Sequence, residues 1–392
     1  MSALGIYVHW PFCRSKCPYC DFNSHVRERV DEARWLAALL AELDHYRALT
    51  GPRDVATVFF GGGTPSLMVP ASAGAIIARI ARNWTLAQDA EVTLEANPNS
   101  AERARFAEFR AAGINRLSLG VQALNDRDLA ALGRGHDAAE AKLAIAHAAA
   151  IFERFSFDLI YARPGQTLAD WRAELGAALA FGSRHLSLYQ LTIEPGTAFH
   201  AIHARGDLVL PPEAEAADLF ELTREMLAHA GLPAYEVSNH AAPGEECRHN
   251  LVYWRYQDYV GVGPGAHGRF APAHSPGAHS PLAKLATRQA RAPETWLAKV
   301  EAAGHATEES VALPPAERAA EALMMGLRLA EGIDAGTFLQ ATGVALAQAL
   351  DQVRLAELVE EGFLIVEGAR LRASEAGMRV LNALIARLGT SD

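Results

Sequence analysis

The sequence predicts an α/β protein: a partial (β/α)6 barrel of parallel strands, similar in design to a TIM barrel, with a small winged-helix-like C-terminal domain. Two observations favour this fold class. Six short apolar runs alternate with longer amphipathic stretches in the first half of the chain, and such alternation is typical of parallel βα units. After Pro314-Pro315 the alternation stops and helical patterns dominate.

The six strand candidates are rich in Val, Ile, Leu, Phe, Tyr or Thr, and each is followed by Gly, Pro, Asn or Gln. They are Leu4–Trp10, Val55–Phe60, Glu91–Ala96, Arg116–Val121, Phe155–Tyr161 and His185–Leu191. The helical patterns between them are Asp31–Leu49, Ala71–Asn83, Ala101–Ala112, Asp126–Phe152 and Thr167–Phe181. Parallel strands that curl into a full or partial barrel place function at their carboxyl ends.

With the remaining segments included, the sequence predicts that the chain is divided into three regions. Val209–Ala230 reads as a helix and Ala234–Val237 as an added strand, which completes a barrel domain over residues 1–270. Residues 271–310 form a Pro-rich connection and a helix, with a loop expected over Ala271–Pro293. Residues 311–392 form the C-terminal domain. Its expected elements are helices at Ala316–Ala330, Ala335–Thr342 and Ala345–Glu360, a hairpin of Gly362–Val366 with Arg370–Arg372, and a last helix at Glu375–Leu388.

Composition and charge exclude several classes of function. The 392 residues carry a formal net charge of −10, which argues against general affinity for nucleic acid. The C-terminal domain has seven arginines against eleven acidic residues, so it is expected to pack or bind a partner rather than DNA. No apolar stretch approaches the roughly 20 residues of a membrane span. Met1–Phe12 lacks the shape of a signal peptide, so a cytoplasmic protein is expected.

Three cysteines lie in one short loop, as C-x₃-C-x₂-C at Cys13, Cys17 and Cys20. A [4Fe–4S] cluster is normally held by four thiolates, so three would leave one iron free to bind a small molecule. A structural zinc site would need His25 or Cys247 as fourth ligand and usually splits its ligands into two pairs. A disulfide would leave one thiol over. The sequence therefore favours a cluster with an open iron.

Distinctive residues follow the other strand candidates. They are Gly61–Pro65, Glu95, Gly120-Val121-Gln122, Arg134 and Asp158. A glycine run lets the backbone pass close to a ligand, arginine suits a carboxylate, and Asp and Gln suit ribose hydroxyls. Each residue alone is equally compatible with a salt bridge, a cap or a tight turn. Because the strands are parallel, we expect these groups to converge on one rim.

Together, the cysteine loop and these rim motifs resemble the radical S-adenosylmethionine (SAM) superfamily, and within it the coproporphyrinogen dehydrogenase group. The resemblance covers nearly the whole chain. It implies that SAM chelates the open iron through its amino and carboxylate groups. It also implies a SAM site lined by Tyr7, Tyr19, Gly62, Gly63, Thr64, Glu95, Gln122, Arg134 and Asp158.

Within this group the sequence is more similar to one branch than to another. The oxygen-independent coproporphyrinogen III oxidase has a further cysteine two residues after the third cluster ligand, where this chain has Phe22, and a basic extension before the residue that matches Tyr7. The segments Cys17–His25 and His249–Trp254 instead resemble the HemW-type haem chaperones. The resemblance implies haem as a third cofactor, haem-accepting proteins such as respiratory enzymes as partners, and an electron donor for the cluster.

A haem ligand is harder to predict. His249 offers an axial imidazole for haem, and Tyr253 and Trp254 offer aromatic walls. The same residues are also compatible with a loop histidine beside a packed Tyr-Trp pair. Cys247 is either a second possible ligand or a buried thiol. Three functions stay open at this point: a haem chaperone, an oxidase that decarboxylates coproporphyrinogen III by a 5′-deoxyadenosyl radical, and a radical SAM methyltransferase or other enzyme acting on an aromatic substrate. Whether the protein is an enzyme is therefore open.

Overall fold

The computed structural model describes residues 3–273 and 283–388, and its main feature is one large curved sheet with helices outside it. Within the described residues the sheet has eleven strands in the order β13-β12-β11-β10-β1-β4-β5-β6-β7-β8-β9. The predicted α/β class is confirmed. No pairing among the described residues joins β9 to β13, so the barrel is partial, as expected.

The six predicted strands follow one another in the sheet in chain order, each parallel to the next. They are β1 (Leu4–Trp10), β4 (Asp54–Gly62), β5 (Thr85–Ala96), β6 (Arg116–Gln122), β7 (Arg154–Tyr161) and β8 (His185–Gln190). Buried apolar side chains such as Ile6, Phe60 and Leu119 hold the sheet against the outer helices. The strands' carboxyl ends therefore meet at one rim.

The outer helices follow the strands, although two predicted helices are each broken in two. They are α1 (Glu32–Thr50), α2 (Pro70–Asn83), α3 (Ser100–Arg103), α4 (Phe106–Ala111), α5 (Asp126–Ala131), α6 (Ala138–Ile151), α7 (Leu168–Leu179), α8 (Ala198–Ala204) and α9 (Glu213–His229). The break between α5 and α6 contains Gly133, whose φ of 65° is left-handed. This break leaves Arg134 on a loop at the rim rather than inside a helix.

Two edges of the sheet differ from the sequence expectation. Ala234–Val237 forms only an isolated bridge, from Ala234 to His240, and the edge strand is β9 (Asn239–Ala241). On the other side, β10 (Asp258–Val262) pairs in parallel with β1. Beyond it run β11 (His267–Phe270), β12 (Lys284–Gln289) and β13 (Thr307–Leu313), all antiparallel, with α11 (Pro293–Ala303) between the last two.

The loop expected over residues 271–293 thus contains a strand, because β12 gains ladder hydrogen bonds from a neighbour on each side. Three of its four prolines stand before residue 284 and one after residue 289, so none interrupts the ladder. Residues 274–282 of this segment lie outside the described part. The boundary drawn at 270 stays a prediction.

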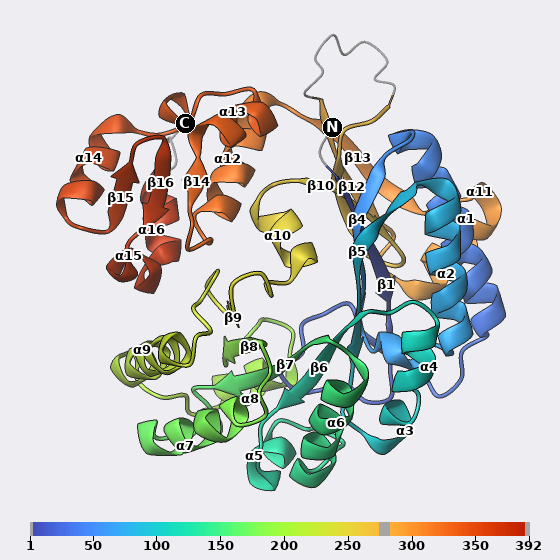
Figure 1. Ribbon diagram of the computed structural model, residues 1–392, viewed down its shortest axis with the longest axis horizontal. Helices are drawn as coiled ribbons and strands as arrows, with labels where there is room; N and C mark the ends of the chain where they lie inside the picture. Colours follow the sequence, from blue (N-terminus) through green and yellow to red (C-terminus); the bar gives the residue numbers. More distant parts are fainter. Residues whose placement is uncertain (1–2, 274–282, 389–392) are drawn as a thin grey trace.

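The C-terminal domain has its own apolar core and a three-stranded sheet in the order β14-β16-β15. Its elements are α12 (Pro315–Gly326), β14 (Ile333–Asp334), α13 (Ala335–Thr342), α14 (Gln352–Glu360), β15 (Leu364–Glu367), β16 (Arg370–Ala373), α15 (Glu375–Arg379) and α16 (Leu381–Leu388). Figure 1 shows this domain beside the sheet, with α10 (Arg248–Trp254) between them. The winged-helix-like order is as expected.

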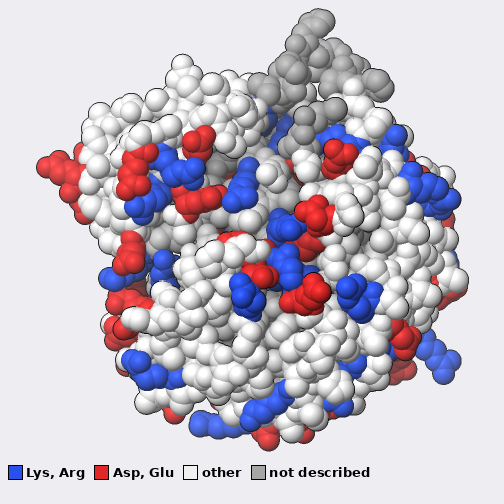
Figure 2. Space-filling view, in the orientation of Figure 1, with Lys and Arg blue, Asp and Glu red and all other residues white. Residues whose placement is uncertain are grey.

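The surface agrees with the charge balance of the sequence. Figure 2 shows acidic and basic side chains interspersed over the viewed face, without a continuous basic stripe. Among the helices of the described residues, none is long and apolar enough to cross a bilayer.

Candidate functional site

A cavity of about 470 Å³ opens at the rim where the parallel strands end. Many of the residues singled out from the sequence line it. They are Cys13, Cys17, Tyr19, Cys20, Gly62, Gly63, Thr64, Glu95, Gln122, Arg134 and Asp158. The sequence therefore places these side chains on the correct rim, and the structure brings them together around one space.

The cysteine loop is held by a small parallel pair, β2 (Phe12–Cys13) with β3 (His25–Val26). Each thiol has a polar neighbour. Thr64 donates its hydroxyl to the Sγ of Cys13 over 3.4 Å, and Arg134 Nη1 donates to the Sγ of Cys17 over 3.2 Å. The Ser24 hydroxyl lies 3.6 Å from the Sγ of Cys20. Burial raises the pKa of the Cys13 thiol, while Thr64 and Arg134 oppose that shift. Hydrogen-bond donors of this kind suit sulfur ligands of a cluster.

In residues 3–273 and 283–388 no three His, Cys, Asp or Glu side chains are already arranged to hold a metal ion. Both candidate fourth ligands for zinc have other partners. His25 Nε2 bonds with the Asn23 side chain, and Cys247 contacts Glu91 Oε1 over 3.6 Å. Burial raises the pKa of the Cys247 thiol to about 11, which disfavours the ligating thiolate. The thiol arrangement fits a cluster with an open iron better than a zinc ion.

The glycine run fixes the cysteine loop against β4. The amide of Gly63 donates to the carbonyl of Trp10 over 2.7 Å, and the amide of Thr64 donates to the carbonyl of Phe12 over 2.9 Å. A Cβ atom at Gly63 would lie 2.8 Å from the Phe12 carbonyl oxygen. Gly62 has a φ of 116°, and its amide donates to Glu95 Oε2 over 3.2 Å. The amides of both glycines are therefore already engaged, and these residues shape the loop that carries the thiols.

Two carboxyl groups, Glu95 and Asp158, lie deep in the cavity wall and have no ion pair within the described residues. Burial and the charge of the nearby Asp158 together raise the pKa of Glu95 to about 8, against the hydrogen bond from the Gly62 amide. Burial likewise raises the pKa of Asp158 to about 7, against a hydrogen bond from Ser187 and the positive charges of Arg116 and Arg134. Buried carboxyls without a direct ion pair favour a ligand that brings positive charge. The ammonium and sulfonium of SAM would do so, and SAM's hydroxyls offer donors, so the acidic wall fits that cofactor.

Arg134 is a buried cation of this cavity, which Arg14 and Lys16 also line, and its guanidinium is fixed from several sides. Nη2 donates to Asn97 Oδ1 over 2.6 Å and to the carbonyl of Gly120 over 2.7 Å. Nη1 reaches the Tyr19 hydroxyl over 3.4 Å as well as Cys17. Its Nε is buried and has no partner in the described part of the chain. An arginine held in this way presents a fixed positive charge beside the thiols, which suits a carboxylate ligand.

The backbone is strained at the end of β6, the strand next to β5. Gln122 has a φ of 75°, which is rare for a residue other than glycine and typical of sites where backbone is held for function. No separate role is predicted for Asn97 from the sequence, although it accepts a hydrogen bond from Arg134 and donates to the Thr64 hydroxyl over 3.2 Å. Its place two residues after Glu95, at the end of β5, is the signal that points to it.

Tyr7 lies outside the first cavity and lines a second one of about 370 Å³, which shares Phe22, Gly62 and Glu95 with the first. Its hydroxyl bonds with His9 Nδ1 over 3.0 Å. Burial and the Glu95 charge both raise the pKa of Tyr7. Tyr7 is therefore a neighbour of the acidic wall rather than part of the cavity that holds the thiols.

His249 is buried in the structure and lines neither cavity. The Nδ1 atom lies 2.8 Å from the Thr57 hydroxyl, and Nε2 lies 2.8 Å from the Tyr253 hydroxyl. Burial lowers the pKa of His249 to about 3, so its ring is neutral. Both nitrogens are engaged, and a haem iron would have to displace one of these partners. The role of His249 as haem ligand stays a prediction.

The two aromatic residues expected to form the walls of one haem pocket are separated. Tyr253 lines the second cavity, whereas Trp254 faces the C-terminal domain and carries Arg328 over its ring at 4.9 Å. The local sequence could not show this, because neighbouring positions of α10 face different sides of the helix.

Comparisons with known proteins agree with this geometry. The family model described as the radical SAM superfamily matches residues 7–176, and the HemN C-terminal domain model matches residues 313–380. A heme chaperone HemW of Escherichia coli is 36% identical over 388 residues, covering 98% of this chain and 98% of that protein. The chain is a radical SAM protein of the HemW family. Members of this superfamily use a [4Fe–4S] cluster and SAM, so both are cofactors here.

One further relative and one solved structure are similar to the chain over nearly its whole length. A mitochondrial radical S-adenosyl methionine domain-containing protein 1 of Bos taurus is 41% identical, covering 98% of this HemW-family chain and 87% of that protein. The solved structure of coproporphyrinogen III oxidase (HemN) from Escherichia coli superposes with a TM-score of 0.81 at 23% identity, covering 99% of this chain and 90% of that chain. At that identity the superposition shows a shared fold and no more.

Proposed function

We propose that this HemW-family protein is a haem chaperone, which binds haem beside a [4Fe–4S] cluster and SAM and transfers it to acceptor proteins. The observation that carries the proposal is the 36% identity with the Escherichia coli haem chaperone over 98% of both chains. The similarity includes the C-terminal domain, so it is not confined to the barrel.

We further propose that Cys13, Cys17 and Cys20 hold the cluster. Their convergence on one cavity, each with a polar neighbour, supports this assignment. SAM would occupy the same cavity, with Arg134 facing its carboxylate and the two acids facing its positive charge and hydroxyls. When bound to a reduced cluster, SAM supplies a route to a 5′-deoxyadenosyl radical. The chain's own residues orient the ligand and balance its charges.

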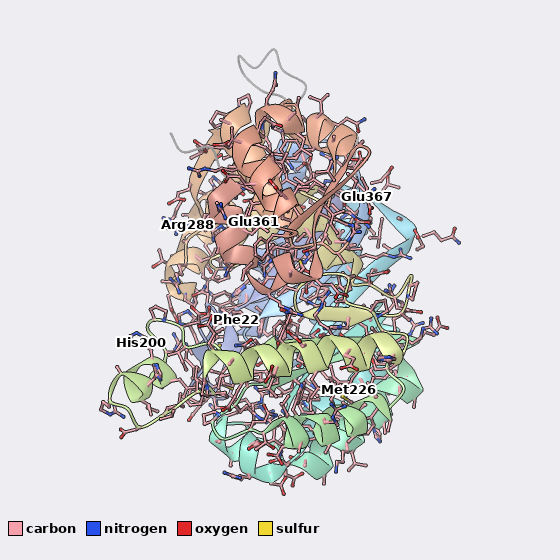
Figure 3. All side chains as sticks on the ribbon, turned by 90° about the vertical axis from the view of Figure 1, so that its left-hand side faces the viewer. Phe22, His200, Met226, Arg288, Glu361 and Glu367 are labelled. Atoms are coloured by element: carbon pink, nitrogen blue, oxygen red, sulfur yellow. The ribbon has the colours of Figure 1, made fainter. Side chains whose placement is uncertain are left out.

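Phe22 weighs against the alternative function, the oxidation of coproporphyrinogen III. It stands where the resemblance to the oxidase calls for a further cysteine, and its side chain has no atom that binds metal. The side chain is 64% exposed at the mouth of both cavities. Figure 3 shows it near the middle of the molecule, below the C-terminal domain in that view. A hydrophobic side chain at this place suits contact with a flat apolar ligand.

The partners we propose are haem, haem-accepting proteins and an electron donor for the cluster. The acidic C-terminal domain is a candidate surface for the acceptor, since it packs outside the barrel and carries exposed apolar side chains such as Leu339 and Val353. We keep the cytoplasm as the proposed location of this chain, although its vertebrate relatives carry a mitochondrial designation.

The test is a haem titration of the full chain after anaerobic reconstitution of the cluster, paired with an assay of coproporphyrinogen III turnover. We expect saturable haem binding, transfer to an apo-haemoprotein, and no decarboxylation. Conversion of coproporphyrinogen III by the reduced protein would instead assign it to the oxidase. Absence of haem binding would remove the chaperone function.

A further inference from the structure

The second cavity is lined by aromatic and histidine side chains and lies directly beside the cavity that holds the thiols. Its aromatic and histidine residues are Tyr7, His9, Phe22, Tyr253, Tyr259 and His267. The rings of Tyr253 and Tyr259 meet edge to face with centroids 4.6 Å apart. The exposed faces of such aromatic rings can pack against the face of a porphyrin.

The histidines near this cavity differ in whether they have a ring nitrogen that is free to bind iron. An imidazole ligates through a ring nitrogen with a free lone pair. His9 has both nitrogens engaged, with the Tyr7 hydroxyl at 3.0 Å and the carbonyl of Asn23 at 2.9 Å. His249 has both engaged as well, and it does not reach the cavity.

His267 is the exception. It stands at the first position of β11, lines the cavity and is exposed. In residues 3–273 and 283–388 neither of its ring nitrogens has a hydrogen-bond partner. Partial burial lowers the pKa of His267, and the neighbouring Arg269 and Arg288 lower it further, so the neutral, ligating form is favoured.

We propose that the second cavity is the haem site of this protein and that His267 is an axial ligand of the haem iron. The inference rests on the proposed chaperone function and goes beyond it, because it locates the cargo and names its ligand. A ring nitrogen of His267 donates its lone pair to the iron, and no electron is exchanged in forming that bond. The porphyrin face packs on the tyrosine walls, and Phe22 covers the exposed edge.

The mouth of this cavity also carries a cation. The side chain of Arg291 lies beside Gly265, is exposed, and forms no ion pair with any residue of the described part. Haem bears two propionates that stay near solvent, and arginine is suited to bind a carboxylate. Arg291 is the residue of this chain that we assign to one propionate.

The experiment is a titration of the full reconstituted chain with haemin and, separately, with metal-free protoporphyrin IX. His267→Ala should weaken haemin binding by about tenfold or more and shift the Soret band, because one iron ligand is lost. It should leave the affinity for metal-free porphyrin unchanged, since that ligand has no iron to bind. Added imidazole should restore the Soret spectrum of the variant.

Three further variants make the result specific. His147→Ala is the matched control, because His147 is exposed on α6 and lines neither cavity. Phe22→Ala should weaken the binding of both porphyrins, since it removes a wall rather than a ligand. His249→Ala, checked for folding by its circular dichroism, should keep the Soret band of the wild type.

The outcomes separate the two claims. An unchanged haemin affinity and spectrum in His267→Ala would overturn the ligand assignment while leaving the chaperone function in place. A change in His249→Ala alone would return the ligand to His249. A wild-type chain that binds no haemin would remove the proposed function itself.

Discussion

At the scale of single residues, the thiols are the first group to test. Cys13, Cys17 and Cys20 line one cavity, whereas Cys247 is buried against Glu91. Replacing any of the first three by Ala should abolish the iron content and the brown chromophore after anaerobic reconstitution. Cys247→Ala should retain both. Loss of the cluster in Cys247→Ala would show that the open-iron arrangement is wrong.

A second prediction concerns the pH dependence of SAM binding. The pKa of Glu95 is raised to about 8 and that of Asp158 to about 7, so at neutral pH Glu95 is mostly protonated and Asp158 is about half protonated. A cationic ligand must displace those protons, and its affinity should therefore rise from about pH 6 to about pH 9. Isothermal titration with SAM measures this directly.

Glu95→Gln supplies the control for that experiment, because the titration of SAM itself is common to both proteins. The ratio of wild-type to variant affinity should grow with pH. A ratio that stays flat across the range would mean that the Glu95 carboxyl does not face the cofactor's charge.

The sequence predicts which residues lie at the rim but not what surrounds His249, for a physical reason. Glu95, Gln122 and Asp158 belong to parallel strands, and the strand pattern alone sends their ends to one edge. The surroundings of His249 depend instead on Thr57, a residue 192 positions away, which occupies its Nδ1. No local pattern reports such a partner.

At the scale of elements, the contact between β4 and the cysteine loop can be broken by one methyl group. Gly63→Ala would place a Cβ 2.8 Å from the backbone of Pro11 and Phe12, and neither backbone group can move aside without shifting the loop. We expect the variant to fold but to reconstitute little cluster, measured as iron per chain. Gly176→Ala, on α7 with open space around it, should leave the cluster intact and preserve stability or raise it by about 0.5–1 kcal/mol.

Another prediction concerns the attachment of α1 to the far edge of the sheet. Glu42 is fully buried and accepts hydrogen bonds from the amides of Gly263 and Ala306 and from Trp296 Nε1. Glu42→Ala would leave these donors without a partner, so we expect a loss of about 3 kcal/mol or more in the free energy of unfolding. Urea denaturation followed by tryptophan fluorescence measures it.

The same residue predicts a pH effect on stability. Burial raises the pKa of Glu42 from 4.5 to about 7, against its hydrogen bonds. A carboxyl with a raised folded-state pKa contributes stability fully below the unfolded value and loses it as pH rises through the folded value. Between about pH 4.5 and 7 the wild type should therefore lose stability relative to Glu42→Gln. An identical pH profile for the two proteins would refute this.

Some elements could be read from the sequence and others could not. The predicted limits of β1 and α13 agree with the structure to the residue, because their apolar periodicity and turn residues are local. Strands β10 to β13 were missed as a group. Their stability comes from pairing across the sheet, with β10 bound to β1 from the other end of the chain, and such pairing leaves little trace in short windows.

At the scale of the whole molecule, Glu321 of the C-terminal domain ties that domain to the barrel. It accepts hydrogen bonds from Arg269, with Nη2 at 2.9 Å, and from the Tyr256 hydroxyl at 2.7 Å. The side chain of Tyr256 also packs into the C-terminal core. Glu321→Ala should weaken the attachment by about 1–3 kcal/mol, and limited proteolysis near residue 314 should become faster. Glu317→Ala, in the first turn of the same helix, is the matched control.

The two cavities share the wall formed by Gly62 and Glu95, and this has a thermodynamic consequence. If SAM and the porphyrin occupy these two cavities as we propose, a ligand that ionises Glu95 from one side changes the field on the other side, and the two binding equilibria are coupled. Linkage then requires reciprocity: whatever factor SAM imposes on the porphyrin's dissociation constant, the porphyrin must impose on that of SAM. If SAM weakens the binding of the porphyrin, then SAM binding promotes porphyrin release. The only change that this requires is the loss of one proton from Glu95.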